Sequence, residues 1–101
     1  MANPVGIDHL SRLHVTIEGR VQGVGFRYFV QEKANGLKLT GWVRNRWNGN
    51  VEVTAEGERE ALGIFLNHLH RGPRSAYVSK VSSEWQAPSG EFTRFDVRPT
   101  A

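Results

Sequence analysis

The fold of this chain is decided by residues 12–30, RLHVTIEGRVQGVGFRYFV, where the hydrophobic period changes. Apolar and polar residues alternate from Arg12 to Glu18, which is typical of a strand with one buried face. From Phe26 to Leu37 the apolar residues recur at helical spacing. The loop between these two patterns, residues 19–25, contains three glycines. The stretch therefore predicts a strand, a glycine-rich loop and a helix in direct succession.

The remaining elements follow from the same two periods and from turn-forming residues. Asn48-Gly49 suits a tight turn between two antiparallel strands, and Gly72-Pro73 ends a second helix that begins near Glu58. The other expected strands cover 40–46, 51–56, 93–97 and 76–85, the last with Tyr77, Val81 and Trp85 on one face. The order βαββαβ plus a short extra strand predicts an α+β, ferredoxin-like split sandwich. Its antiparallel sheet would carry both helices on one face.

Length and composition predict one ordinary globular domain. The chain has 101 residues, of which 39% are hydrophobic and 23% charged. We expect a domain over 11–101 after a flexible lead-in, residues 1–10. The sequence shows neither an apolar run of about 20 residues, as a membrane span needs, nor a signal peptide. These features favour a cytoplasmic monomer. The lack of cysteine excludes disulfides, thiolate nucleophiles and cysteine metal sites.

The net charge of +3 favours an anionic partner. The arginines are scattered along the chain, with no run of five or more like charges that would suggest a nucleic-acid arm. A focused anion site is therefore favoured over a basic stripe.

The glycine-rich loop is the first candidate for such a site. Unpaired amides at a helix N-terminus attract anions, and glycines let the preceding backbone curl around one. Arg27, in the first turn, could grip two phosphate oxygens. The loop matches neither a Walker A loop, which needs a following Lys-Ser or Lys-Thr, nor the third glycine of a dinucleotide loop. A tight turn whose glycines only satisfy geometry explains the loop equally well.

Asn45 is the second candidate. In the split fold the first and second strands are parallel, so Gly19 and Asn45 would lie at the same edge of the sheet. A neutral amide can orient a water molecule but cannot act as a lasting base. Taken without the loop, Asn45 is better explained as a residue that supports the neighbouring hairpin turn.

Two segments together resemble the acylphosphatases. They are residues 19–27, GRVQGVGFR, and 41–45, GWVRN, with Gly49, Val51 and Gly57 at the expected offsets. The resemblance covers nearly the whole chain and implies hydrolysis of acyl phosphates to a carboxylate and inorganic phosphate. It implies no metal, no cofactor and no covalent enzyme intermediate. Inorganic phosphate, as the product, is expected to inhibit competitively.

The resemblance also implies the roles of individual residues. Arg27 would bind the phosphate and Asn45 would orient the attacking water. The backbone of the surrounding loop would complete the phosphate site, through Arg20, Val21, Gln22, Gly23, Val24, Gly25, Phe26 and Arg27.

Other titratable residues are interpreted structurally. His68 and His70 lie two apart on a helix and so point to different faces, which excludes a shared metal. His14 has no carboxylate at a sequence spacing that would indicate a catalytic partner. The remaining acidic residues are assigned to a solvated strand edge and to the start of a helix, where negative charge is favourable. They are Glu52, Glu56, Glu58 and Glu60.

Two non-catalytic functions are the alternatives. RNA-recognition modules share the βαββαβ order, but they stack bases on aromatic residues of the central strands, and residues 51–56 contain none. No nucleic-acid partner is therefore expected. A catalytically idle anion-sensing module is the other alternative, and the presence of Arg27 and Asn45 opposes it.

Overall fold

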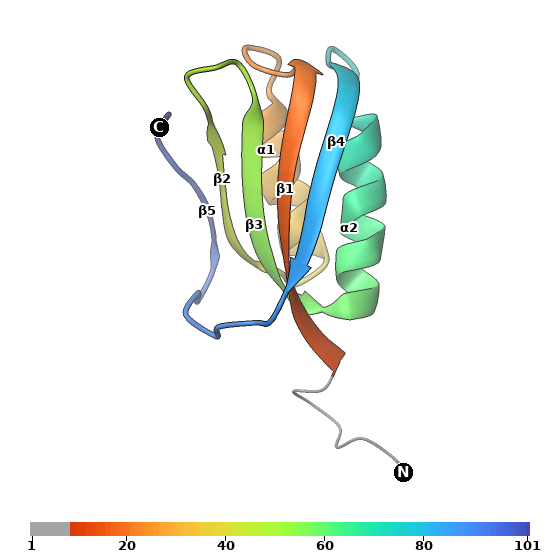
Figure 1. Cartoon of the computed structure of the whole chain (residues 1–101), viewed down its shortest axis with the longest axis vertical. Coiled ribbons are helices and arrows are strands. Elements are labelled where there is room, and N and C mark those ends of the chain that lie inside the picture. Colours follow the sequence, from red (N-terminus) through yellow and green to blue (C-terminus); the bar gives the residue numbers. More distant parts are fainter. Residues whose placement is uncertain (1–8) are drawn as a thin grey trace.

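The structure, a computed structural model, describes residues 9–101. A five-stranded sheet carries two helices on one face, as Figure 1 shows. The elements are β1 (Leu10–Arg20), α1 (Phe26–Gly36), β2 (Thr40–Asn45), β3 (Val51–Glu58), α2 (Arg59–Arg71), β4 (Tyr77–Gln86) and β5 (Phe95–Val97). This confirms the predicted ferredoxin-like α+β fold.

The predicted lead-in, residues 1–10, falls mostly on residues 1–8, which lie outside the described residues. Of the remainder, Leu10 already belongs to β1, where it pairs with Glu58 of β3. The sheet therefore begins before the predicted boundary. Within the described part of the chain, no helix is long and apolar enough to cross a membrane.

The strand order β4-β1-β3-β2-β5 sets which ends of the strands meet. Strands β1 and β2 both pair with β3 in the antiparallel sense. They are therefore parallel to each other, and their C-terminal ends lie at the same end of the sheet, as predicted. Strand β5 pairs with β2 in the parallel sense, so this short strand makes the otherwise antiparallel sheet mixed.

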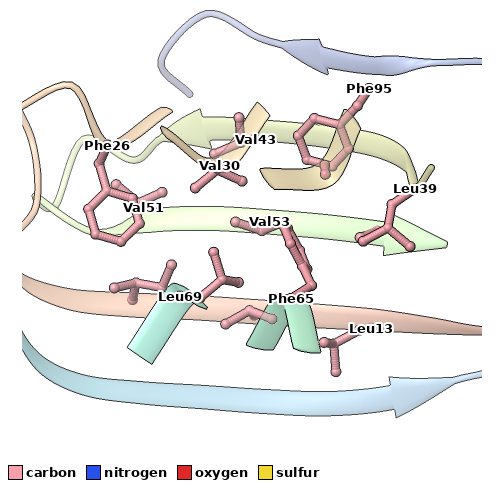
Figure 2. Close-up of a cluster of buried hydrophobic side chains, with 14 of the residues drawn as sticks. Leu13, Phe26, Val30, Leu39, Val43, Val51, Val53, Phe65, Leu69 and Phe95 are labelled. Atoms are coloured by element: carbon pink, nitrogen blue, oxygen red, sulfur yellow. The ribbon is translucent and has the colours of Figure 1, made fainter. Parts of the chain in front are cut away.

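The hydrophobic core fills the space between the sheet and the two helices, as Figure 2 shows. Alternate residues of β1 are fully buried, as the period of two predicts. Residues at helical spacing in α1 and α2 meet them from the other side. The Phe65 ring of α2 also meets the Phe95 ring of β5 edge-on, with 6.2 Å between centroids. The core thus fixes both helices, including the start of α1, against the sheet.

The prediction that Tyr77, Val81 and Trp85 share one face of β4 is wrong, because this strand contains a bulge. Glu18 lies opposite Lys80 but Gly19 lies opposite Val78, so Ser79 is an extra residue. The extra residue inverts the alternation beyond it. Val78 therefore packs against the core, whereas Tyr77 is 68% exposed and does not share a face with Val81.

Candidate active site

The anion loop, residues 20–27, joins the end of β1 to the first turn of α1. Gly23 and Gly25 have φ angles of 73° and 78°, in the left-handed region that glycine adopts without strain. A Cβ at either position would meet no atom within 4 Å, so the space beside both glycines is open. The loop therefore needs glycine for its backbone conformation and leaves room for a ligand.

The start of α1 is a helix end without a side-chain cap. Gly25 is the N-cap residue, and no side chain accepts from the first amides of the helix. The first helical hydrogen bond is donated by Phe29 N to Gly25 O, at 3.1 Å. The first-turn N–H groups before it have no acceptor within the helix. An anion at this position would receive these donors and lie at the positive end of the helix dipole.

The side chains of the anion loop divide into buried anchors and exposed groups. Val21 and Phe26 are buried in the core, so only their backbones can face a ligand. Arg20 is exposed at the end of β1, opposite Tyr77 of β4. Arg27 is partly exposed, and none of the ion pairs among residues 9–101 involves it. The Arg27 charge is thus free to meet an anion at the loop.

Asn45 is the last residue of β2 and lies on the helix-facing side of the sheet with Val43. It is 9% exposed, and its Oδ1 atom is shielded without a hydrogen-bond partner in the described structure. A buried acceptor without a partner is costly, so such a group in a folded protein requires an explanation. The backbone of Asn45, in contrast, is tied to its neighbours: its carbonyl oxygen accepts from Ala101 N at 3.1 Å.

Gln22 has a role that the sequence did not reveal, because the prediction assigned it only a backbone contribution. Its side-chain Nε2 donates to Arg46 O at 2.7 Å and to Asn50 O at 2.9 Å. Both acceptors lie in the turn between β2 and β3. The side chain therefore fastens the anion loop to the hairpin that follows Asn45. A glutamine within a glycine-rich loop was the only signal, and it did not indicate which carbonyls would accept.

Comparison with known proteins identifies this arrangement. The family model for acylphosphatase matches residues 13–97. The chain belongs to the acylphosphatase family. It is 49% identical over 84 residues to an acylphosphatase of Moorella thermoacetica, covering 83% of this chain and 90% of that protein. An acylphosphatase of Thermus thermophilus is also 49% identical, over 80% of this chain and 92% of its own length. The family assignment confirms the resemblance predicted from the two segments.

A solved relative extends the likeness to three dimensions. The crystal structure of acylphosphatase from Bacillus subtilis matches with a TM-score of 0.84 and 40% identity. The match covers 88% of this chain and 98% of that one. The acylphosphatase fold therefore accounts for nearly all of the described structure.

Outside the anion loop, His14 and Glu52 form a contact that the sequence did not predict. On the sheet face away from the helices, His14 Nε2 donates to Glu52 at 2.7 Å, and Arg44 Nε donates to the same carboxylate at 2.8 Å. Burial would raise the pKa of Glu52, but these two hydrogen bonds and the two neighbouring charges outweigh it and lower that pKa. His14 therefore does have a carboxylate partner, in a structural cluster on this face.

Glu56 also departs from the expected solvated edge, because it is buried. Its carboxylate accepts from Ser89 N and Ser89 Oγ, both at 2.8 Å, and from Gly90 N at 2.9 Å. Arg12 Nε lies 3.4 Å away. Burial would raise the pKa of Glu56, but the three hydrogen bonds and the Arg12 charge lower it. This side chain holds the loop between β4 and β5 against the sheet.

Metal-ligand clusters and aromatic residues on β1 and β3 were the features on which metal and RNA binding would depend. Across residues 9–101, no group of three or more His, Cys, Asp or Glu side chains is placed to hold a metal ion. The two central strands, β1 and β3, contain no Phe, Tyr or Trp on which bases could stack.

Proposed function

We propose that this chain hydrolyses the carboxyl–phosphate bond of small-molecule acyl phosphates, which yields a carboxylate and inorganic phosphate. The match to the acylphosphatase family over residues 13–97 is the observation that carries this function. Relatives at 49% identity that are named acylphosphatase support it. An open, glycine-rich loop at an uncapped helix N-terminus is a suitable receptor for the phosphate group.

We assign phosphate binding to the anion loop and Arg27. The backbone amides of the loop and the first turn of α1 would donate to the phosphate oxygens. The Arg27 guanidinium, which no described acid neutralises, would offset their charge. Val21 and Phe26 would hold the loop from the core side.

Asn45 would orient the attacking water through its amide. The water oxygen forms a bond to phosphorus, and the bond from phosphorus to the carboxyl oxygen breaks. The acyl group leaves with the bonding electron pair as a carboxylate, and the proton lost by the water ends on phosphate or in solvent. Because a carboxylate is a good leaving group, positioning and charge stabilisation can supply most of the catalysis. The unpartnered Oδ1 of Asn45 supports this role.

Three further features stay predictions from the sequence. The product phosphate should compete with substrate, because both use the same amides and Arg27. The monomeric state and the cytoplasmic location are expected from composition alone.

The function is tested by hydrolysis of benzoyl phosphate in the presence of a metal chelator, comparing the wild type with Asn45→Ala. We expect chelator-resistant turnover by the wild type and a loss of roughly 10²- to 10³-fold in kcat in the variant. A wild type with no activity above buffer would refute the proposed function. An active Asn45→Ala variant would refute only the assigned role of Asn45.

A further inference from the structure

The chain beyond β5 continues along the outer edge of β2, as Figure 1 shows. We call residues 98–101 the edge segment. Arg98 N donates to Val43 O at 2.8 Å, and Ala101 N donates to Asn45 O at 3.1 Å. Trp47 N then donates to Ala101 O at 3.2 Å. These three backbone hydrogen bonds connect the edge segment to Val43, Asn45 and Trp47. They therefore extend from β2 to just beyond its last residue, and Asn45 is the middle one of the three partners.

A side-chain contact also holds the edge segment. The guanidinium of Arg98 lies 5.1 Å from the centroid of the Trp42 ring, and that of Arg44 lies 4.7 Å from the same ring. Such cation–π contacts are attractive. The segment is therefore fixed at Arg98 by a backbone hydrogen bond and a ring contact, and at Ala101 by two hydrogen bonds.

The placement of Asn45 depends on its backbone because its side chain has no partner. Its Oδ1 makes no hydrogen bond in the described structure. On one side the Asn45 backbone is paired with Val51 of β3, and on the other side it is tied to Ala101. Without the edge segment, Asn45 would be the last residue of a strand with one unpaired side, where strand ends fray readily.

We infer that the edge segment is a positioning element for Asn45: it fixes the direction of the amide that orients the water. This inference rests on the proposed function. Within residues 9–101, the segment forms no hydrogen bond or ion pair with the anion loop, whose own tie to the hairpin is made by Gln22. Loss of the segment should therefore lower turnover and leave phosphate binding nearly unchanged.

Two variants test the inference. The first deletes residues 98–101, and the second, Ala101→Pro, keeps the segment but removes the N–H that donates to Asn45 O. We expect both to lower kcat for benzoyl phosphate by roughly 10- to 100-fold, because small displacements of catalytic groups have effects of this size. The dissociation constant for inorganic phosphate should stay within about twofold, since binding and turnover use different groups. Ala101→Pro keeps the inference testable if the deletion variant fails to fold.

The control variant is Arg94→Ala. It removes an exposed arginine that directly precedes β5 in the chain, and it should retain kcat. Both test variants are also made in an Asn45→Ala background. If the segment acts through Asn45, they should there change kcat by no more than about twofold.

Each contrary result has its own meaning. Unchanged kcat in the two test variants, weakened phosphate binding, or an equal loss in the Asn45→Ala background would each overturn the inference while the proposed function stands. An inactive wild type would instead overturn the proposed function, and the positioning role with it.

Discussion

Arg27 and Asn45 lie at the same end of the sheet but offer different chemistry. Arg27 carries a charge that no described acid pairs with, in the first turn of an uncapped helix. Asn45 offers a neutral amide whose Oδ1 is shielded from solvent, and the residue is held through its backbone. A charge acts on the anion in the ground state as well as during reaction, whereas a water-orienting amide acts mainly on the attack. The two residues should therefore leave different kinetic signatures.

We predict that Arg27→Ala weakens inorganic phosphate binding and lowers kcat/KM by roughly 10²- to 10³-fold. Asn45→Ala should lower kcat by a similar factor with phosphate affinity near that of the wild type. Steady-state kinetics with benzoyl phosphate and phosphate competition measure both effects. Equal losses of phosphate affinity in the two variants would contradict this division of roles.

Between elements, Gln22 joins the anion loop to the β2–β3 hairpin. One side-chain nitrogen donates to two backbone carbonyls of the hairpin, those of Arg46 and Asn50. The hairpin itself is closed by Arg46 N donating to Asn50 O at 2.8 Å. The loop that would hold the phosphate and the strand end that carries Asn45 are therefore kept in a fixed relation by a single amide group.

We predict that Gln22→Ala lowers the free energy of unfolding by about 1–2 kcal/mol, since two hydrogen bonds are lost. It should also reduce kcat/KM by roughly tenfold, because the loop and Asn45 lose their alignment. Gln22→Glu is the matched variant: it has nearly the same shape but cannot donate to the two carbonyls. It should be at least as damaging as Gln22→Ala in urea unfolding and in activity. A Gln22→Glu variant with wild-type stability would show that the two hydrogen bonds contribute little.

The sequence predicted these elements better than it predicted the contacts between them. The change of period within 12–30 is local, so β1, the loop and α1 were all predicted correctly. The partner of His14 lies 38 residues away in Glu52, and the acceptors of Gln22 lie 24 and 28 residues away. Such pairs depend on the register of β1 against β3, which no local pattern contains. The bulge at Ser79 was missed for the same reason, since it is a property of two paired strands.

For the whole molecule, two acidic side chains of β3 tie together distant parts of the chain. Glu56 binds the loop at Ser89 and Gly90, and Glu52 binds His14 of β1 and Arg44 of β2. In both carboxyls, hydrogen bonds and neighbouring charges outweigh the effect of burial and lower the pKa in the folded state. Folding thus favours the ionised form of both groups, which makes stability depend on pH.

The sign of this dependence follows from the lowered pKa. The stabilising effect is complete above the ordinary carboxyl pKa of about 4.3 and is lost as the pH falls toward the lower folded-state pKa. We predict that the contribution of these two carboxylates to the urea midpoint is constant near neutral pH and decreases below about pH 4.3. Glu56→Gln should be less stable by about 2 kcal/mol at neutral pH, because an amide nitrogen replaces an acceptor that faces N–H donors. It should also show a shallower decrease in acid, and an acid profile identical to that of the wild type would contradict the assignment.

The unpartnered oxygen of Asn45 is unfavourable for folding, whereas the water-orienting role proposed for Asn45 would require its amide. A shielded acceptor without a donor costs about 1–3 kcal/mol, a sizeable part of the marginal stability of a small domain. Replacing it by an apolar side chain of similar size, as in Asn45→Leu, should therefore raise the urea midpoint while turnover is lost. Selection for thermostability alone would remove this amide, and only selection for activity would retain it.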